Sequence, residues 1–149
     1  MNHDLQATTD PVLIAELHVR ELAEQGKAYS TEEVVEKWRS IPARQFIVAG
    51  ACGFIAFQER DAFTCYMSDL YVDPHYRGQG LGRALVNAVK GGHRCVELHV
   101  AQDNAAARAL YRSEGFIEAH SEGRAESQVF MKYTAAQQAD PADRASRGH

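Results

Sequence analysis

The chain has 149 residues, 45% of them hydrophobic and 24% charged, which predicts one globular domain with a sizeable core. Its net charge of −4 argues against nucleic-acid binding, because neutralising phosphates requires a basic face. No apolar run approaches the roughly 18 residues of a membrane span, and the N-terminus lacks the layout of a signal peptide, so we expect a cytoplasmic protein without a membrane partner.

Two helices are predicted at the start of the chain, and a short strand before them is compatible with the sequence. Asp10, followed by a proline, is typical of a helix start, and Gly26 is typical of its end. The residues STEE at 30–33 match a capping box for a second helix, which Pro42 ends. Residues 1–40 hold eight acidic and four basic side chains, which accounts for the whole net charge. Such a surface either favours a cationic partner or is the solvated outer face of the helices.

The remaining elements are predicted from turn signals and apolar spacing. Aromatic and β-branched runs predict strands, and apolar residues at helical spacing before Gly91 and Gly115 predict helices. The expected strands lie near residues 45–50, 53–58, 62–72, 94–100, 116–121 and 127–133, and the expected helices near 80–90 and 104–115. We expect the domain to cover residues 1–133, and the polar, proline-broken tail of residues 134–149 to be disordered.

Cysteine and histidine usage argues against disulfides and against a metal centre. Cys52, Cys65 and Cys95 are odd in number and show no C-x-x-C spacing. Cys65 and Cys95 lie in strand-like runs, where cysteine usually acts as a small buried apolar residue. The seven histidines are scattered and form no H-E-x-x-H pair. We therefore expect neither a disulfide framework nor a bound metal.

The middle of the chain has the order of a crossover unit. The strand at 62–72 is followed by a glycine-rich loop, the helix at 80–90 and the strand at 94–100. A strand, a helix and a second strand in this order usually place the two strands side by side and parallel. The loop between them then ends at a helix start, where backbone N–H groups point outward without partners.

The glycine-rich loop is predicted to bind an anion. Gly78, Gly80 and Gly82 would let a ligand approach these N–H groups, and the helix dipole favours a negative charge there. Arg77 and Arg83 would add charge-assisted hydrogen bonds. A diphosphate is the ligand that we predict, whereas a flexible turn is the plainer alternative.

Two common nucleotide motifs do not fit this loop. No Lys-Ser or Lys-Thr follows the glycines, as a P-loop requires. The dinucleotide fingerprint G-x-G-x-x-G fails because Arg83 stands where its third glycine belongs. Nucleotide hydrolysis and dinucleotide chemistry are therefore disfavoured.

Two segments resemble the GNAT N-acetyltransferases. The residues RGQGLG at 77–82 match that family's R-x-x-G-x-G acetyl-CoA signature. About thirty residues further on, NAAARALYRSEGF is similar to its N-x-x-A-x-x-x-Y-x-x-x-G-F segment. The matching positions there are Asn104, Ala107, Tyr111, Gly115 and Phe116. The resemblance covers residues 62–117 and implies an α/β (α+β) fold. Its mixed, mostly antiparallel sheet would have six to seven strands, a splayed parallel pair and about four flanking helices.

The resemblance implies acetyl-CoA as the cosubstrate and assigns residues to it. The pyrophosphate of the cofactor would bind the loop residues Arg77, Gly78, Gln79, Gly80, Leu81, Gly82 and Arg83. The pantetheine arm would run along backbone groups of Leu70, Tyr71 and Val72 like an added strand. Asn104 would also contact the cofactor, and its plainer role is to cap its own helix.

The resemblance also casts Tyr111 as the acid that protonates the departing thiolate, since its ordinary pKa of about 10 keeps the hydroxyl protonated at neutral pH. The plainer alternative is a tyrosine that packs on the sheet. The resemblance does not supply a base, because Ser68 stands where diamine-type members of the family carry a glutamate. Asp69 is our first candidate; it points to the opposite face in a regular strand, and a bulge would turn it. Glu97, His99 and a water chain stay open as alternatives.

We therefore expect an acetyl-CoA-dependent N-acetyltransferase that acts by direct attack in a ternary complex. The acidic leading helices favour a small cationic amine as acceptor, and a protein N-terminus or lysine is the alternative acceptor. A non-catalytic acyl-CoA-binding module and a phosphate-binding domain without CoA are alternatives from other classes. Because members of the family are often dimers, a homodimer is a further expectation.

Overall fold

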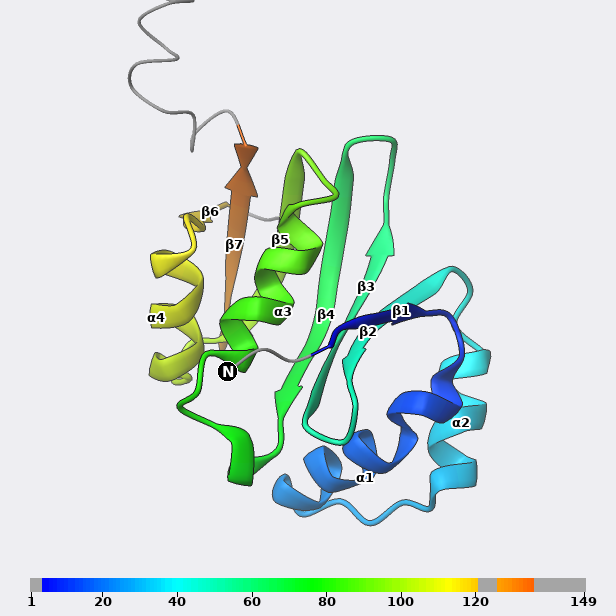
Figure 1. Cartoon of the computed structure of the whole chain (residues 1–149). Helices are drawn as coiled ribbons and strands as arrows, with labels where there is room; N and C mark the ends of the chain where they lie inside the picture. Colours follow the sequence, from blue (N-terminus) through cyan, green and yellow to red (C-terminus); the bar gives the residue numbers. More distant parts are fainter. Residues whose placement is uncertain (1–3, 121–125, 136–149) are drawn as a thin grey trace, which may run out of the picture.

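The computed structural model describes residues 4–120 and 126–135. Its strands are β1 (Gln6–Thr8), β2 (Arg44–Ala49), β3 (Gly53–Glu59), β4 (Thr64–Val72), β5 (Cys95–Ala101), β6 (Ile117–Ala119) and β7 (Gln128–Thr134). Its helices are α1 (Ala15–Glu24), α2 (Thr31–Arg39), α3 (Leu81–Lys90) and α4 (Ala105–Ser113), with 3-10 turns η1 (Pro11–Ile14) and η2 (Pro74–Tyr76). The strands form one sheet in the order β1-β2-β3-β4-β5-β7-β6 (Figure 1).

The sheet is antiparallel except at β4 and β5, which run parallel. This confirms the fold class expected from the sequence, including the crossover through α3. Alternate residues of β3 face opposite sides of the sheet. Ile55 packs with Leu85 of α3 and Tyr111 of α4, whereas Phe54 packs with Leu17 of α1 and Trp38 of α2. The two predicted amphipathic helix pairs therefore cover the two faces of the sheet.

The first helix begins later than its sequence signals indicate. Asp10 does act as a cap, and its carboxylate accepts a hydrogen bond from the Val12 N–H at 3.0 Å. The first turn, however, is the 3-10 turn η1, and α1 begins only at Ala15. The second helix follows its prediction more closely, because Ser30 and Glu33 exchange both hydrogen bonds of a capping box.

The parallel pair separates toward its far end, and this separation positions the site. β4 pairs with β5 only over Thr64–Met67 and Cys95–Leu98. Beyond these residues β4 stays paired with β3 as far as Val72, and β5 stays paired with β7 as far as Ala101. A gap between two strands therefore opens in the middle of the sheet, and the backbone groups that face it have no partner strand.

A bulge lies where this gap opens. Met67 pairs with Phe57, and Asp69 pairs with Ala56, so Ser68 is an extra residue in β4. Met67 and Phe57 belong to the core under α3 and α4, whereas Ala56 belongs to the core under α1 and α2. The extra residue therefore moves Asp69 onto the α1 and α2 face, since paired residues share a face.

Two further sequence expectations can be compared with the structure. Cys65 and Cys95 are buried in strands and unbonded, which confirms their apolar role, and burial raises the pKa of the Cys65 thiol to about 12. Within residues 4–120 and 126–135, no helix is both long and apolar enough to cross a membrane. The cytoplasmic location stays a prediction. β7 ends at Thr134, and residues 136–149 of the expected tail lie outside the described residues.

Candidate active site

The glycine-rich loop presents a row of free backbone donors. The amides of residues 78–83 donate no hydrogen bond to any described residue, and the first α3 bond is from the Ala84 N–H to the Gly80 carbonyl, at 3.0 Å. No side chain caps the start of α3. Because the dipole of α3 also favours negative charge at this end, the loop is suited to an anionic ligand.

The three glycines of the loop serve two different purposes. Gly78 and Gly80 have φ angles of 79° and 85°, which lie in the left-handed region that favours glycine. A Cβ on either residue would find no atom within 4 Å, so the space in front of both is open. Gly82 instead packs closely: its Cβ would lie 3.5 Å from a Leu110 methyl carbon. Two glycines thus shape the loop, and the third lets α3 approach α4.

The two arginines of the loop already have protein partners. Arg77 donates from Nε to the Val72 carbonyl at 2.8 Å and from its guanidinium to Glu24 of α1 at 2.9 Å. Arg83 pairs with Glu114 and donates to the Ser113 hydroxyl at 3.0 Å. Both side chains are about half exposed, at 49%, and each makes two of these contacts with a guanidinium that has five N–H donors, so both could also contact a ligand at the surface.

The three backbone positions expected along the pantetheine arm do not all face the gap. The Asp73 N–H bonds to the Cys52 carbonyl on the β3 side, at 2.8 Å, so the preceding Val72 carbonyl points toward the gap, where Arg77 contacts it. Leu70 shares this orientation, because groups two residues apart in a strand point the same way. The Tyr71 carbonyl faces β3, since a Cβ on Gly53 would lie 2.7 Å from it. The open positions are therefore Leu70 and Val72.

Tyr111 lies on the α3 and α4 face of the sheet. Its side chain is 7% exposed and packs against Phe116, with 5.6 Å between ring centroids. Among the described residues its hydroxyl has no hydrogen-bond partner. Burial, and secondarily the charge of Asp69, raises the pKa of Tyr111 to about 12. The hydroxyl therefore keeps its proton at any physiological pH.

Asp69 lies on the opposite face, where the Ser68 bulge directs it. Burial raises the pKa of Asp69 to about 6, and the negative charge of Glu21 adds to this rise. A group with this pKa is mostly ionised at neutral pH and is still basic enough to accept a proton. The bulge that Asp69 was expected to need in order to change faces is therefore present. It gives Asp69 the face that Ser68 would otherwise occupy.

The alternative bases occupy neighbouring positions. Glu97 and His99 share one face of β5, as expected. The Tyr66 hydroxyl and the His99 Nδ1 lie 2.8 Å apart, and the His99 ring packs at 5.1 Å from Phe130. His99 is thus held in a network on the sheet, whereas the orientation of Asp69 results from a local irregularity of the strand. Asp69 stays our candidate.

One cluster beside Asp69 was missed at the sequence level. The cluster consists of His18 and Glu21 of α1 and Asp69 of β4. One ring nitrogen of the histidine and one carboxylate oxygen of each acid lie within 4.8 Å of one another. No spacing rule connects residues so far apart in the chain, and without the bulge Asp69 would point away from α1. The only local signal was the three-residue spacing of His18 and Glu21 on one helix face.

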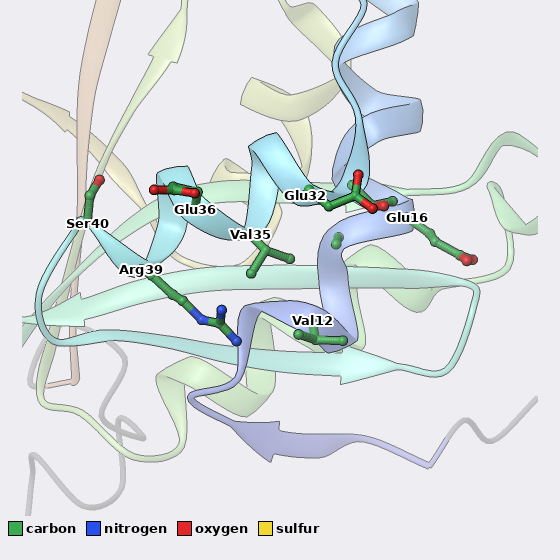
Figure 2. A pocket seen from close by; sticks show the side chains of 9 residues that line it. Val12, Glu16, Glu32, Val35, Glu36, Arg39 and Ser40 are labelled. Carbon is green, nitrogen blue, oxygen red and sulfur yellow. The ribbon is translucent and has the colours of Figure 1, made fainter.

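A separate hollow lies between η1, α1 and α2 (Figure 2). It has a volume of about 740 Å³, and its acidic lining consists of Glu16, Glu32 and Glu36, with Arg39 at one end. It includes no residue of β4, the glycine-rich loop or α4. Several acids of the leading helices therefore face this hollow, whereas Glu21 and Glu24 face the site.

Asn104 performs its plainer role. Its side-chain oxygen accepts a hydrogen bond from the Ala107 N–H at 3.1 Å and so caps α4. This cap holds the N-terminus of the helix that carries Tyr111. A contact of Asn104 with a cofactor stays a prediction.

The sheet opens between two parallel strands, and free amides follow at a helix start, which is the arrangement that the resemblance to the GNAT family implied. Residues 42–118, just over half of the chain, match the family model of the acetyltransferase (GNAT) domain. The chain therefore belongs to the GNAT acetyltransferase family.

Named relatives agree with this assignment. The N-alpha-acetyltransferase RimI of Mycobacterium tuberculosis is 38% identical over 73 residues, which are 46% of this chain and 45% of that protein. A ribosomal-protein alanine N-acetyltransferase of Escherichia coli is 48% identical over 56 residues, or 34% of this chain and 38% of that protein. These matches span less than half the length of either relative. A spermidine N-acetyltransferase structure from Vibrio cholerae has the same fold, with a TM-score of 0.72 at 18% identity over 93% of this chain and 99% of that chain.

Proposed function

We propose that this protein transfers an acetyl group from acetyl-CoA to a primary amine, by direct attack of the amine in a ternary complex. The observation that carries the proposal is the row of free amides at residues 78–83, placed at the end of the strand that borders the gap. A diphosphate bound to these amides would direct the rest of a CoA molecule along Leu70 and Val72. Their gap-side backbone groups would hydrogen-bond the pantetheine arm.

The two faces of the sheet would then divide the chemistry. The gap lets a thioester carbonyl lie between the α1 side and the α4 side, and backbone N–H groups of β4 would polarise that carbonyl. Asp69 would remove a proton from the attacking nitrogen on the α1 side. Tyr111 would donate its proton to the departing sulfur on the α4 side. Attack on the thioester carbonyl gives a tetrahedral carbon that bears both the nitrogen and the sulfur. Because these two atoms occupy different positions around that carbon, the base and the acid can lie on different sides of it.

Two acceptor classes have separate support. A small cationic amine is favoured by the charge near Asp69, because Glu21 and Glu24 lie on this side of α1. The α-amine of a protein is favoured by the named relatives, of which one is an N-alpha-acetyltransferase and another acts on a ribosomal-protein alanine. A non-catalytic acyl-CoA module is favoured by Ser68, which stands where diamine-type members of the family carry a glutamate. Tyr111 argues against such a module, because its side chain is buried and its hydroxyl has no hydrogen-bond partner among the described residues, so its proton is available as an acid.

Release of free thiol from acetyl-CoA is the experiment that tests the proposal. The protein is incubated with acetyl-CoA and, separately, spermidine, a short peptide with an N-terminal alanine, and the same peptide with a blocked N-terminus and one lysine. We expect thiol release with one amine class above the rate without amine. Calorimetric binding of CoA without turnover on any amine would support the non-catalytic module. Absence of CoA binding at millimolar concentration would exclude both.

Asp69→Asn should remove the dependence of turnover on a group that titrates near pH 6. The folded chain holds the pKa of Asp69 at about 6, so kcat/KM of the unaltered protein should fall more steeply below pH 6 than protonation of the amine alone requires. In the variant this steeper fall should be absent, and kcat at pH 7.5 should be lower by roughly 10²-fold. The control is Glu16→Gln, which removes a charge in the separate hollow. An unchanged pH profile in Asp69→Asn would exclude Asp69 as the base.

Asp69→Asn should also stabilise the fold at high pH. The pKa of Asp69 is raised from 3.8 to about 6, so the folded state binds a proton more tightly than the unfolded state does. Ionisation of Asp69 therefore costs stability as the pH rises from about 4 through 6, and the full cost is present above 6. We expect the variant to gain roughly 1–3 kcal/mol in the free energy of unfolding at pH 8, and nothing at pH 3.5. Urea unfolding at the two pH values measures this, and an equal gain at both would point to another cause.

A further inference from the structure

The α1 helix brings two polar side chains against the face to which Asp69 is turned. Glu21 and His18 come from the same face of α1, and Asp69 comes from the residue after the bulge in β4. One ligand atom from each side chain lies within 4.8 Å of the others. Beyond lining the acceptor side of the proposed site, this helix therefore places charge directly beside the candidate base.

His18 is fixed more firmly than an ordinary surface histidine. It is 3% exposed, and its ring packs edge-on against Trp38 at 5.3 Å and Phe54 at 6.0 Å between centroids. Its Nδ1 lies 2.7 Å from a Glu21 carboxylate oxygen. Its Nε2 is buried and has no hydrogen-bond partner among the described residues. Among the described residues, the polar contact of His18 is thus with Glu21. Because the ring is packed in place, it gives the Glu21 carboxylate a defined position.

Glu21 is largely removed from water, with a side chain 14% exposed. A carboxylate in this position interacts with its neighbours with less screening than a surface acid does. A second negative charge within 5 Å makes loss of the proton from Asp69 less favourable. The effect is in the direction that a general base requires, because a stronger base accepts a proton from an amine more readily.

We propose that Glu21, held in place by His18, is a positioning residue that makes the Asp69 carboxylate a stronger base. The inference rests on the proposed function, in which Asp69 accepts the proton of the amine. The inference adds that Glu21 and His18, for which no contact with the acetyl group is proposed, set the pH range in which Asp69 can accept this proton. Glu21 would act through its negative charge, and His18 would act by fixing the place of that charge.

Groups on every neighbouring element enter this balance. Burial is the largest cause of the raised Asp69 pKa, and Glu21 of α1 is the next. His18 of α1, Lys37 of α2 and the adjacent Ser68 of β4 act in the opposite direction. Asp69 in turn raises the pKa values of Tyr111 of α4 and Tyr66 of β4. Glu21 is therefore the one named neighbour whose removal should weaken the base.

The test is a titration of the Asp69 carboxyl by ¹³C NMR in protein labelled at aspartate, with Asp69→Asn used to assign the signal. We expect Glu21→Gln to lower the titration midpoint by about half a pH unit or more, the size of one charge at this distance with substantial screening. The steep fall of kcat/KM should move by the same amount, while the Kd of CoA stays unchanged. Glu21→Asp keeps the charge but shortens the side chain, and should give an intermediate midpoint.

Glu16→Gln is the matched control, because it removes the same charge from the same helix in the separate hollow. It should leave the Asp69 midpoint unchanged. A Glu21→Gln variant that titrates like the unaltered protein would overturn the inference while leaving Asp69 as the base. Loss of the base assignment itself would appear differently, as an Asp69→Asn variant with an unaltered pH profile.

A divalent-metal site is the alternative explanation for this cluster, because an imidazole and two carboxylates can bind Zn²⁺. Calorimetric titration with Zn²⁺ distinguishes the two. Micromolar or tighter binding that Glu21→Gln abolishes would overturn the positioning role, whereas binding that the variant leaves unchanged, or weak binding only, supports it.

Discussion

Tyr111→Phe is expected to lower kcat by roughly 10²- to 10⁴-fold, the usual contribution of a positioned acid, without changing the affinity for CoA. The hydroxyl makes no hydrogen bond among the described residues, so its removal should leave α4 and the sheet intact. Its raised pKa of about 12 means that the proton is available throughout the working pH range. Stopped assays of thiol release give kcat, and calorimetry gives the Kd of CoA.

Tyr133→Phe is the matched control for this substitution. Tyr133 is buried on the same side of the sheet, at 8% exposure, and its ring also packs against Phe116, at 5.7 Å. It comes from β7, away from the gap, so loss of its hydroxyl should leave kcat within about twofold. Equal losses in both variants would mean that Tyr111 acts through packing and would remove it from the chemistry.

Gly80→Asp is expected to weaken CoA binding by at least about 100-fold, a loss equivalent to two good hydrogen bonds or one opposing charge. Gly80 is the N-cap of α3, and a carboxylate there would accept hydrogen bonds from the same amides that a diphosphate needs. Its negative charge would also repel the ligand. Calorimetric titration with CoA measures the effect.

Gly26→Asp is a control with a closely similar backbone. Gly26 has a φ angle of 78°, compared with 85° for Gly80, and neither residue has an atom within 4 Å of a built Cβ. Both substitutions should therefore cost roughly 1–2 kcal/mol of stability from the left-handed conformation. Only Gly80→Asp should alter CoA binding. Retained affinity in that variant would show that the free amides are not the diphosphate site.

Contacts between α1 and the segment after β4 connect the proposed acceptor side with the proposed cofactor side. Arg20 of α1 pairs with Asp73 at 2.9 Å, and Glu24 pairs with Arg77 at 2.9 Å. Because Arg77 pairs with Glu24 of α1, a cofactor contact by Arg77 would link the proposed binding at the loop to the position of α1. The Glu24–Arg77 pair is about half exposed at both side chains and contributes little stability by itself, whereas Asp73 in the other pair is buried.

The sequence by itself determined the parts of this protein that depend on neighbouring residues. The capping box of Ser30, the cap at Asn104 and the open loop at 77–82 all follow from local hydrogen bonding and backbone preference. The order of strand, helix and strand around that loop fixed the parallel pair, because crossover connections have one favoured geometry. The family resemblance rested on the same short-range segments.

Only the tertiary structure decided which face each side chain uses and which distant residues meet. A single extra residue, Ser68, exchanges the faces of every later side chain in its strand, and this is a property of the pairing with β3 that no alternation pattern reveals. That exchange takes Asp69 to the α1 face, where His18 and Glu21 lie. Pairing with a partner strand and packing against a helix depend on residues far apart in the chain. The sequence could therefore name the candidate bases, but it could not predict which side chains surround each of them.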